Sequence, residues 1–257
     1  MKGNIEIRDP CARFKFFSSL VSSISWRTPL HSTRKKRHTM YKTSYQSAPS
    51  FSIFTPTGTK PCKHWSLRGR VTREYSQGCG GLAISLGRGG GGMSLPKEGV
   101  GRNGAGLGKG EGLGLRQKFL AVQIFTPSGG TADVTVELGV TTGDGCTALR
   151  RMSFSSRFKH ESRGKVMCTP LESRFPLDLG GEGGWANVVF DMGGIVGDAW
   201  KEEFVSLESI SVRGGSSGPG GGSGGPMVRR VFTLRDHPRD ADVPGGMDFP
   251  RNSRAWK

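Results

Sequence analysis

The sequence has few of the residues on which disulfide frameworks, zinc sites and membrane-spanning helices depend. It contains no C-x-x-C pair and no long apolar run. Its cysteines are odd in number and widely spaced: Cys11, Cys62, Cys79, Cys146 and Cys168. A disulfide framework or zinc site is therefore not expected, and a reducing compartment fits this cysteine content best. No apolar stretch approaches the roughly 20 residues that span a bilayer, so no membrane span is expected.

Motifs of catalysis and cofactor binding are also missing. The five histidines are scattered, none has metal-ligand spacing, and G-x-S-x-G does not occur. Gly87–Gly92 matches G-x-G-x-x-G in letters, but no helical pattern follows it. Gly108-Lys109 is followed by Gly110, where a phosphate-binding loop requires Ser or Thr. We therefore expect no enzyme activity, no cofactor, no metal and no small-molecule substrate.

Acidic residues are scarce relative to basic ones. The chain has 37 Lys and Arg against 21 Asp and Glu, a formal net charge of +16. Residues 1–39 carry nine basic residues against Glu6 and Asp9, so they contribute +7 and the remainder contributes +9. Such a chain is attracted to polyanions, whether nucleic acid, an anionic membrane or the acidic surface of a protein polymer. Charge alone does not choose among these.

Glycine placement predicts the domain organisation. Residues 87–114 hold 13 of the 42 glycines and residues 213–226 hold 8, and both segments are predicted to be flexible loops. Without them and both tails, roughly 150 patterned residues remain, enough for one core. We therefore expect one domain over residues 40–237 with two long glycine-rich insertions, followed by a polar tail over 238–257.

Residues 1–39 allow three interpretations. Arg13–Trp26 is compatible with an organelle transit peptide, because apolar residues alternate with serines and acids are few. The basic run Arg34–His38 is compatible with a nuclear localisation patch. The segment is otherwise a disordered extension, or translation starts at Met40.

Hydrophobic residues recur mostly with period two, which predicts β-strands. Val134, Val136, Leu138 and Val140 alternate with polar residues or glycine, as in an antiparallel strand with one buried face. Phe119–Phe125 is almost continuously apolar, as in a central strand with both faces covered. The other predicted strands are Phe51–Phe54, Leu82–Leu86, Leu149–Phe154, Trp185–Met192, Glu208–Arg213 and Val228–Leu234. Val196, Ala199, Trp200 and Phe204 recur at helical spacing and predict one short helix after Asp191. The pattern indicates an all-β antiparallel sandwich with about eight strands.

Four ordered blocks of the sequence resemble one known domain. They are Tyr45–Trp65 with Tyr45-Gln46-Ser47 and Gly58-Thr59-Lys60-Pro61, Leu113–Phe125 with Gln117-Lys118-Phe119-Leu120-Ala121-Val122-Gln123-Ile124, Trp185–Asp191, and Arg229–Leu234. In these blocks the chain resembles the cilia- and flagella-associated protein 20 (CFA20) domain family, particularly its longer members. The resemblance implies a jelly-roll-like sandwich and a non-enzymatic structural role in cilia, flagella or centrioles. It also implies binding to tubulin or another axonemal protein, with the protein located at the axoneme or basal body.

Two sets of residues are singled out on these grounds. The core is expected to contain Trp65, Phe119, Leu120, Val122, Ile124, Trp185, Phe190 and Phe232. The candidate partner contacts are Lys60, Arg150, Arg151, Arg229 and Arg230. Adjacent arginines on a strand point to opposite faces, so at least one of each pair should reach the surface and bind carboxylates. The alternative is a solvated sheet face with no partner.

Two other functions stay open at this point. A basic nuclear protein that binds RNA or DNA is suggested by Arg34–His38 and by the Gly/Arg segment Arg88–Arg102. Against it, the loops offer almost no aromatic residues for base stacking, and charge alone would give only non-specific, salt-dependent binding. A sugar-binding sandwich is the third possibility. However, two of the five tryptophans are expected in the core and two lie in the tails, which leaves little for a stacking platform.

Overall fold

The computed structural model describes residues 39–41, 46–87, 89–97, 112–128, 133–143, 148–158, 167–179, 183–215 and 225–238. The expected N-terminal extension (to residue 38), residues 98–111 and 216–224 of the glycine-rich segments, and residues 239–257 of the expected tail lie outside the described residues. None of the described helices is long and apolar enough to cross a membrane.

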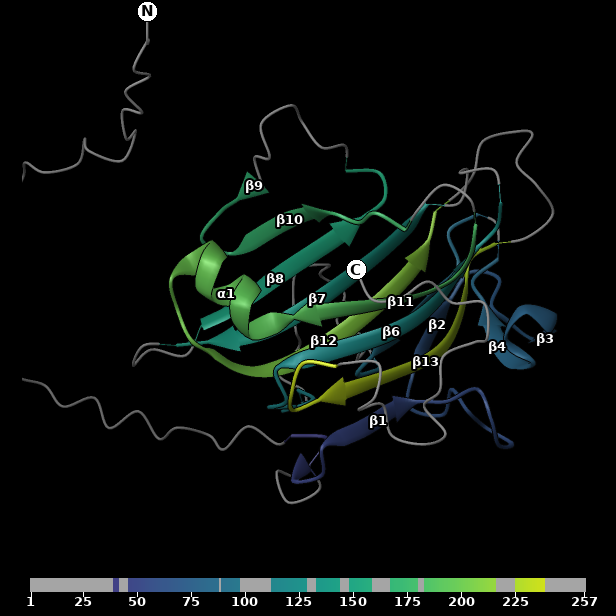
Figure 1. Cartoon of the computed structure of the whole chain (residues 1–257), viewed down its shortest axis with the longest axis horizontal. Coiled ribbons are helices and arrows are strands. Elements are labelled where there is room, and N and C mark those ends of the chain that lie inside the picture. The colour runs from purple at the N-terminus through teal and green to yellow at the C-terminus, as the bar shows by residue number, and fades with distance from the viewer. Residues whose placement is uncertain are drawn as a thin grey trace, which may run out of the picture. The chain divides into compact units, whose positions relative to one another are not determined.

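The described part of the chain forms two β-sheets packed face to face (Figure 1). The six-stranded sheet has the order β11-β6-β13-β4-β3, with β1 also paired to β13, and the seven-stranded sheet has the order β2-β5-β12-β7-β8-β10-β9. The strands of the first sheet are β1 (Ser50–Phe54), β3 (Thr72–Ser76), β4 (Gly81–Ser85), β6 (Phe119–Thr126), β11 (Gly184–Asp191) and β13 (Met227–Leu234). Those of the second are β2 (Ser66–Arg68), β5 (Gly92–Leu95), β7 (Val134–Thr142), β8 (Ala148–Ser155), β9 (Met167–Cys168), β10 (Glu172–Pro176) and β12 (Phe204–Gly214). The predicted all-β sandwich is confirmed.

The main core lies between the two sheets, and two strands show why these residues form it. On β7, Val134, Val136, Leu138 and Val140 are fully buried while the residues between them are half-buried, as the alternation predicts. On β6, Leu120, Val122 and Ile124 belong to the main core. Ala121 instead joins a second cluster on the outer face of the sheet with Phe232 and Leu234. The continuous apolar run of β6 is thus explained by burial on both faces.

The prediction that residues 87–114 form one flexible loop is wrong for part of that segment. Gly92–Leu95 forms β5, which pairs with both β2 and β12. Leu113 and Leu115 are fully buried, and Leu115 exchanges backbone hydrogen bonds with Leu207. Backbone pairing and a few large apolar residues hold these elements in place. The surrounding glycines leave no periodic pattern in the sequence from which the elements could be predicted.

One strand pair departs from the antiparallel arrangement that the sequence predicts. β10 runs parallel to β8, with Glu172 opposite Arg151 and Phe175 opposite Phe154. Parallel neighbours need a connection of about a dozen residues or more, since the chain must return to the same end of the sheet. The segment between Ser155 and Glu172 supplies that length and adds the short strand β9 on the way.

The single α-helix of the described residues, α1 (Met192–Trp200), links β11 of one sheet to β12 of the other. Asp191 caps it, because its side chain accepts a hydrogen bond of 2.9 Å from the Gly194 backbone N–H. The predicted helical stripe is correct for Val196, which is buried, but wrong for Phe204. The helix ends at Lys201, which has a φ of 58°, so Phe204 begins β12 instead.

Strand β13 contains a bulge that changes the expected position of one arginine. Strict alternation would place Arg229 on the same face as Val231, but Val228 and Val231 both lie in the main core although they are three residues apart. The register with β6 shifts between Val228 and Arg230, which absorbs the extra residue. Arg229 and Arg230 are both half-buried, and neither is a core residue.

The second glycine-rich segment joins two points that lie close together. The Gly214 N–H donates to Gly91, and the Leu86 N–H donates to the Pro226 carbonyl. A Cβ placed on Gly214 would lie 2.9 Å from Pro226 Cγ. A short connection would therefore also span the gap.

Replacing residues 216–224 by a Gly/Ser linker of half that length is expected to stabilise the fold slightly. Loop closure changes by about 0.6 kcal/mol for each doubling of length, so halving it should add about 0.6 kcal/mol. Urea denaturation would measure the difference. A loss of more than about 2 kcal/mol would contradict the prediction and give the segment a structural role.

Candidate partner-binding site

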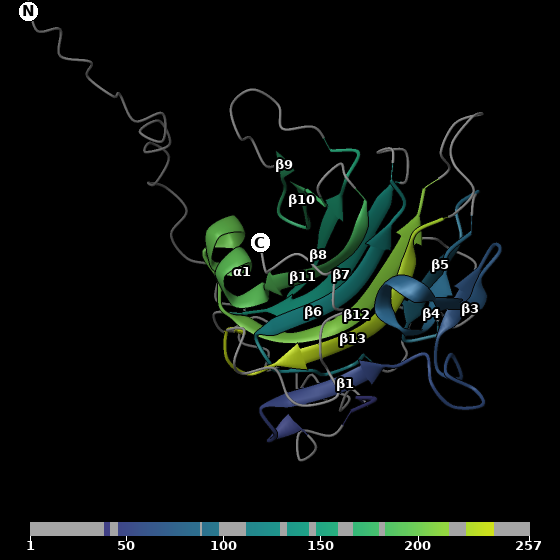
Figure 2. The ribbon, with the colours of Figure 1, turned by 45° about the vertical axis from the view of Figure 1, so that its right-hand side comes forward.

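A hollow of about 700 Å³ opens between the ends of the two sheets, where β2 and β3 are the terminal strands. Its apolar floor includes Trp65 and Ile84, exposed by only 4% and 2%. Basic side chains also line it, and all of them are exposed: Lys60, Lys63, Arg73 and Lys97. The lining contains no acidic residue. This end of the sandwich lies away from α1 in Figures 1 and 2.

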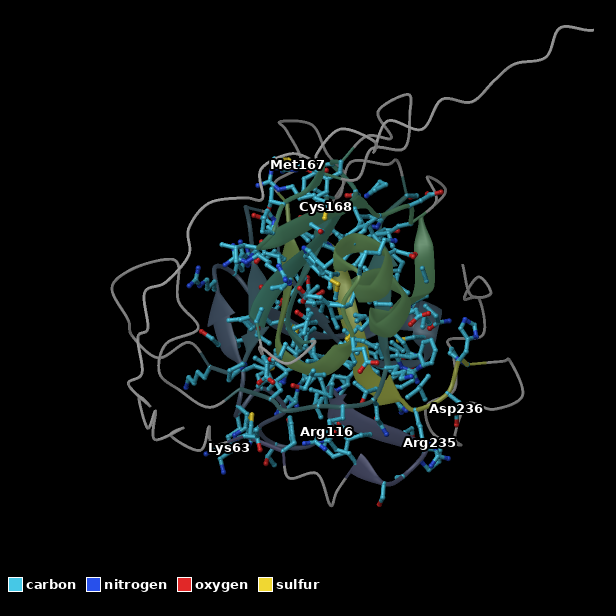
Figure 3. All side chains as sticks on the ribbon, turned by 90° about the vertical axis from the view of Figure 1, so that its left-hand side faces the viewer. Lys63, Arg116, Met167, Cys168, Arg235 and Asp236 are labelled. Atoms are coloured by element: carbon cyan, nitrogen blue, oxygen red, sulfur yellow. The ribbon has the colours of Figure 1, made fainter. Side chains whose placement is uncertain are left out.

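Hydrogen bonds fix the turn that carries two of these cations. The Lys63 N–H donates to the Lys60 carbonyl at 3.2 Å, and the Trp65 N–H donates to the Cys62 carbonyl at 3.0 Å. Trp65 itself packs edge-on against Phe54, with the ring centroids 5.5 Å apart. The buried tryptophan thus anchors a segment whose lysine side chains point to solvent. Figure 3 shows Lys63 at the periphery, far from Met167 and Cys168 at the other end of the domain.

Arg73 joins the edge strand β3 to the same turn. It pairs across the ladder with Ile84 on β4, so its side chain leaves the sheet on the face of the core. Because β3 is a terminal strand, the guanidinium reaches the opening, where Nη1 donates to the Gly58 carbonyl at 2.7 Å. Arg73 therefore holds the Lys60 turn against β3 and adds its own charge to the rim.

Cys62 lies half-buried in the lining beside these cations. Burial raises the pKa of its thiol, while the charge of Arg73 acts in the opposite direction. A raised pKa keeps the side chain a neutral thiol near pH 7, and the lining supplies no histidine or carboxylate to deprotonate it. This arrangement can attract anions, but it does not form a nucleophile–base pair. Among the residues that the structure describes, no group of His, Cys, Asp and Glu could hold a metal ion.

The five contact candidates from the sequence do not come together. Lys60 lies on the rim of the hollow, Arg150 and Arg151 lie on β8 of the seven-stranded sheet, and Arg229 and Arg230 lie on β13 of the six-stranded sheet. Arg151 is exposed. Sequence reasoning missed three rim residues: Lys63, Arg73 and Lys97. A count over residues 55–76, with five Lys and Arg against Glu74 alone, would have drawn attention to most of this region.

Arg150 is engaged within the domain. It forms an ion pair with Glu202, its Nε donates to Glu202 Oε2 at 3.1 Å, and its guanidinium lies 5.3 Å from the centre of the Trp200 ring. Its side chain is only 12% exposed. The pair ties β8 to the segment between α1 and β12, which gives Arg150 a role within the domain.

This ion pair predicts a pH dependence of stability. The hydrogen bonds from Thr142 and then Arg150 lower the pKa of Glu202 below its ordinary value of 4.5. A carboxyl whose pKa is lowered by folding stabilises the fold above its unfolded pKa and loses that effect as the pH falls through the folded pKa. Glu202→Gln is therefore expected to be less stable than the natural chain near pH 7, and the difference should vanish in acid.

Urea midpoints measured from pH 7 to pH 3 would test this. Glu172→Gln is the matched control. Glu172 pairs with Arg174 on β10, in the same sheet as Arg150, but this ion pair is more exposed, so the substitution should change the urea midpoint little. A Glu202→Gln difference that stays constant across the pH range would contradict the prediction.

The core candidates lie where a sandwich needs them. Phe119 is half-buried beside the outer cluster, and the others are buried: Trp65, Leu120, Val122, Ile124, Trp185, Phe190 and Phe232. The Trp185 indole N–H donates to Ser76 Oγ at 3.3 Å, and its ring packs beside Phe125 at a centroid distance of 5.6 Å. Neither Trp65 nor Trp185 is therefore placed as an exposed stacking surface.

The fold and this site define a β-sandwich domain with a basic opening between its sheets. The sequence profile of the CFA20 domain matches residues 40–215. The chain therefore belongs to the CFA20 domain family, and membership of this family indicates a protein associated with cilia and flagella. The match ends at Gly215, whereas the sheet continues through β13, which lies between β6 and β4.

A comparison of folds finds similarity to the crystal structure of the Agl-KA catalytic domain. The identity is 11% and the TM-score 0.32, and the match covers 78% of this chain but 30% of that one. A similarity at this level supports no conclusion about fold or activity.

Proposed function

We propose that the protein is a non-enzymatic structural component of the ciliary or flagellar axoneme or of the basal body. In this proposal, exposed basic residues of the sandwich bind microtubules or a neighbouring axonemal protein. Membership of the CFA20 domain family carries the proposal. The net charge of +9 on residues 40–257 supports it, because the microtubule surface is acidic.

The candidate residues differ in how far they are available for a partner contact. Lys60, Lys63 and Arg151 are exposed on the sandwich, whereas Arg150 is held by Glu202. Arg229 and Arg230 are half-buried and each already has an interaction within the chain. Charge reversal at Arg229 or Arg230 would therefore disturb the sheet as well as any partner contact, and exposed lysines give cleaner test variants.

Co-sedimentation with stabilised microtubules tests the proposal. The chain starting at Met40 is used, so that the basic leader does not contribute, and the salt concentration is varied around about 0.15 M. Tubulin with and without its acidic tails is compared. Saturable binding that persists at this salt and after removal of the tails is the expected result, because a specific lattice contact does not depend on long-range charge alone.

Binding that disappears at moderate salt for both tubulin preparations would overturn the microtubule contact. Such salt-sensitive binding would be non-specific electrostatic attraction between a basic protein and an acidic polymer. Selective binding to one RNA or DNA sequence or structure under the same conditions would instead favour the nuclear nucleic-acid function, and with it a nuclear location.

A further inference from the structure

The basic hollow lies at an end of the described sandwich where both sheets finish in a short and largely exposed strand. β2 is the terminal strand of one sheet and β3 of the other, and neither pairs on its outer edge with another described strand. Residues Thr72–Tyr75 of β3 are all exposed. Charged residues on an edge strand prevent self-association, but they do not need to share one sign for that purpose. β3 itself carries Arg73 beside Glu74, but the charged residues that line the hollow are all basic.

Three of the rim cations have no acidic partner among the described residues. Lys60, Lys63 and Lys97 form no ion pair with any described residue, and the lining contains no carboxylate. Lys97 comes from the segment after β5, whereas Lys60 and Lys63 come from the turn before β2. Positive charges gathered from separate elements without counterions raise the local concentration of anionic ligands.

The shape of the site favours an extended chain over a small anion. A volume of about 700 Å³ exceeds what a phosphate or a single carboxylate fills, and the cations come from three separate segments of the chain: the turn before β2, strand β3 and the segment after β5. An extended peptide can pair its backbone with an exposed sheet edge while alternate side chains enter pockets. The lining also contains Leu67, which is 45% exposed and suits contact with an apolar side chain, and the lysines suit carboxylates.

The same lining argues against a nucleic acid. Single strands are bound without sequence preference when bases stack on exposed aromatic rings. Trp65 is the only aromatic residue of the lining, and it is 4% exposed. Tyr75 on β3 is 67% exposed but lies outside the lining.

We infer that the hollow between β2 and β3 binds an extended acidic peptide segment of a partner protein. Lys60, Lys63 and Lys97 bind its carboxylates, and Arg73 holds the Lys60 turn in place. This site goes beyond the proposed microtubule contact and does not depend on it, because the peptide is recognised by its own charge and by the exposed Leu67 of the lining.

Fluorescence anisotropy with the full-length chain tests the inference. The probe is a labelled glutamate peptide with one central leucine, titrated at about 0.15 M salt to suppress long-range attraction. The double variant Lys60→Glu/Lys63→Glu is compared with Lys118→Glu/Lys201→Glu. Both change the charge equally at exposed positions, but Lys118 and Lys201 lie beside the two ends of α1, away from the hollow.

The rim variant is expected to bind the peptide about 10-fold more weakly, and the control variant within about 2-fold of the natural chain. Equal weakening in both variants would overturn the site, because net charge would then explain the binding. Tighter binding of a charge-matched oligothymidine, lost in the same rim variant, would overturn the peptide as ligand.

The two proposals fail separately. Loss of microtubule co-sedimentation with retained, rim-dependent peptide binding would remove the proposed microtubule contact and leave this site standing. Retained co-sedimentation without rim-dependent peptide binding would remove the peptide site and leave the proposed microtubule contact standing. Thermal unfolding of each variant confirms that exposed substitutions leave the fold intact, since such changes are usually within about 0.5 kcal/mol.

Discussion

A chain that ends at Gly215, the last residue matched by the CFA20 domain profile, is expected not to fold. The missing strand β13 pairs with β1, β4 and β6, so its removal breaks the six-stranded sheet in the middle. It also removes four side chains exposed by 4% or less: Val228, Val231, Phe232 and Leu234. At about 1.5–3 kcal/mol each, their burial contributes about 6–12 kcal/mol, comparable to the whole stability of a domain.

Circular dichroism and urea denaturation would show the effect as the loss of a cooperative transition. Two controls separate the strand from the mere shortening of the chain. The full-length variant with the shortened 216–224 segment should unfold cooperatively, and a peptide of residues 225–238 added to the truncated chain should restore structure. A cooperative transition in the truncated chain alone would show that the domain ends where the family match ends.

Strands with a regular pattern of apolar residues were predictable from the sequence, and two short strands without such a pattern were not. β6 and β7 lie at their predicted positions, because burial on one or both faces leaves a pattern of apolar residues. β3 was missed, since an edge strand with Thr72–Tyr75 exposed needs no apolar alternation. β5 was missed because its glycine belongs to a low-complexity run. Backbone pairing, which leaves little trace in the sequence, holds β3. β5 adds the buried core side chains Met93 and Leu95 to its pairing.

The candidate site was predictable only through Lys60. Its other cations come from elements up to 37 positions apart, and only the fold brings Lys97 to the hollow that Lys60 lines. Arg150 was predicted as a partner contact, but it pairs with Glu202 of the same chain. No pattern in the sequence connects these two residues. A basic pair on a strand indicates charge at the surface, but it does not say whether a carboxylate of the same chain already neutralises that charge.

Trp65→Ala is expected to destabilise the domain by about 3–5 kcal/mol, and Trp65→Phe by clearly less. The indole is 4% exposed, packs edge-on against Phe54 and belongs to the main core with Ile84. Truncation would leave a cavity below the turn of Lys60 and Lys63, whereas phenylalanine keeps most of the packing. Equilibrium urea denaturation would measure both variants.

The same two variants separate an anchoring tryptophan from one that contacts a ligand. If Trp65 serves as floor and anchor, Trp65→Phe should keep the rim lysines in place and bind the glutamate peptide within about 3-fold of the natural chain. If the ring instead stacks directly on a ligand, both variants should lose binding while Trp65→Ala loses little stability. Its burial and its ring contact with Phe54 favour the first outcome, because a stacking ring must present a face to solvent.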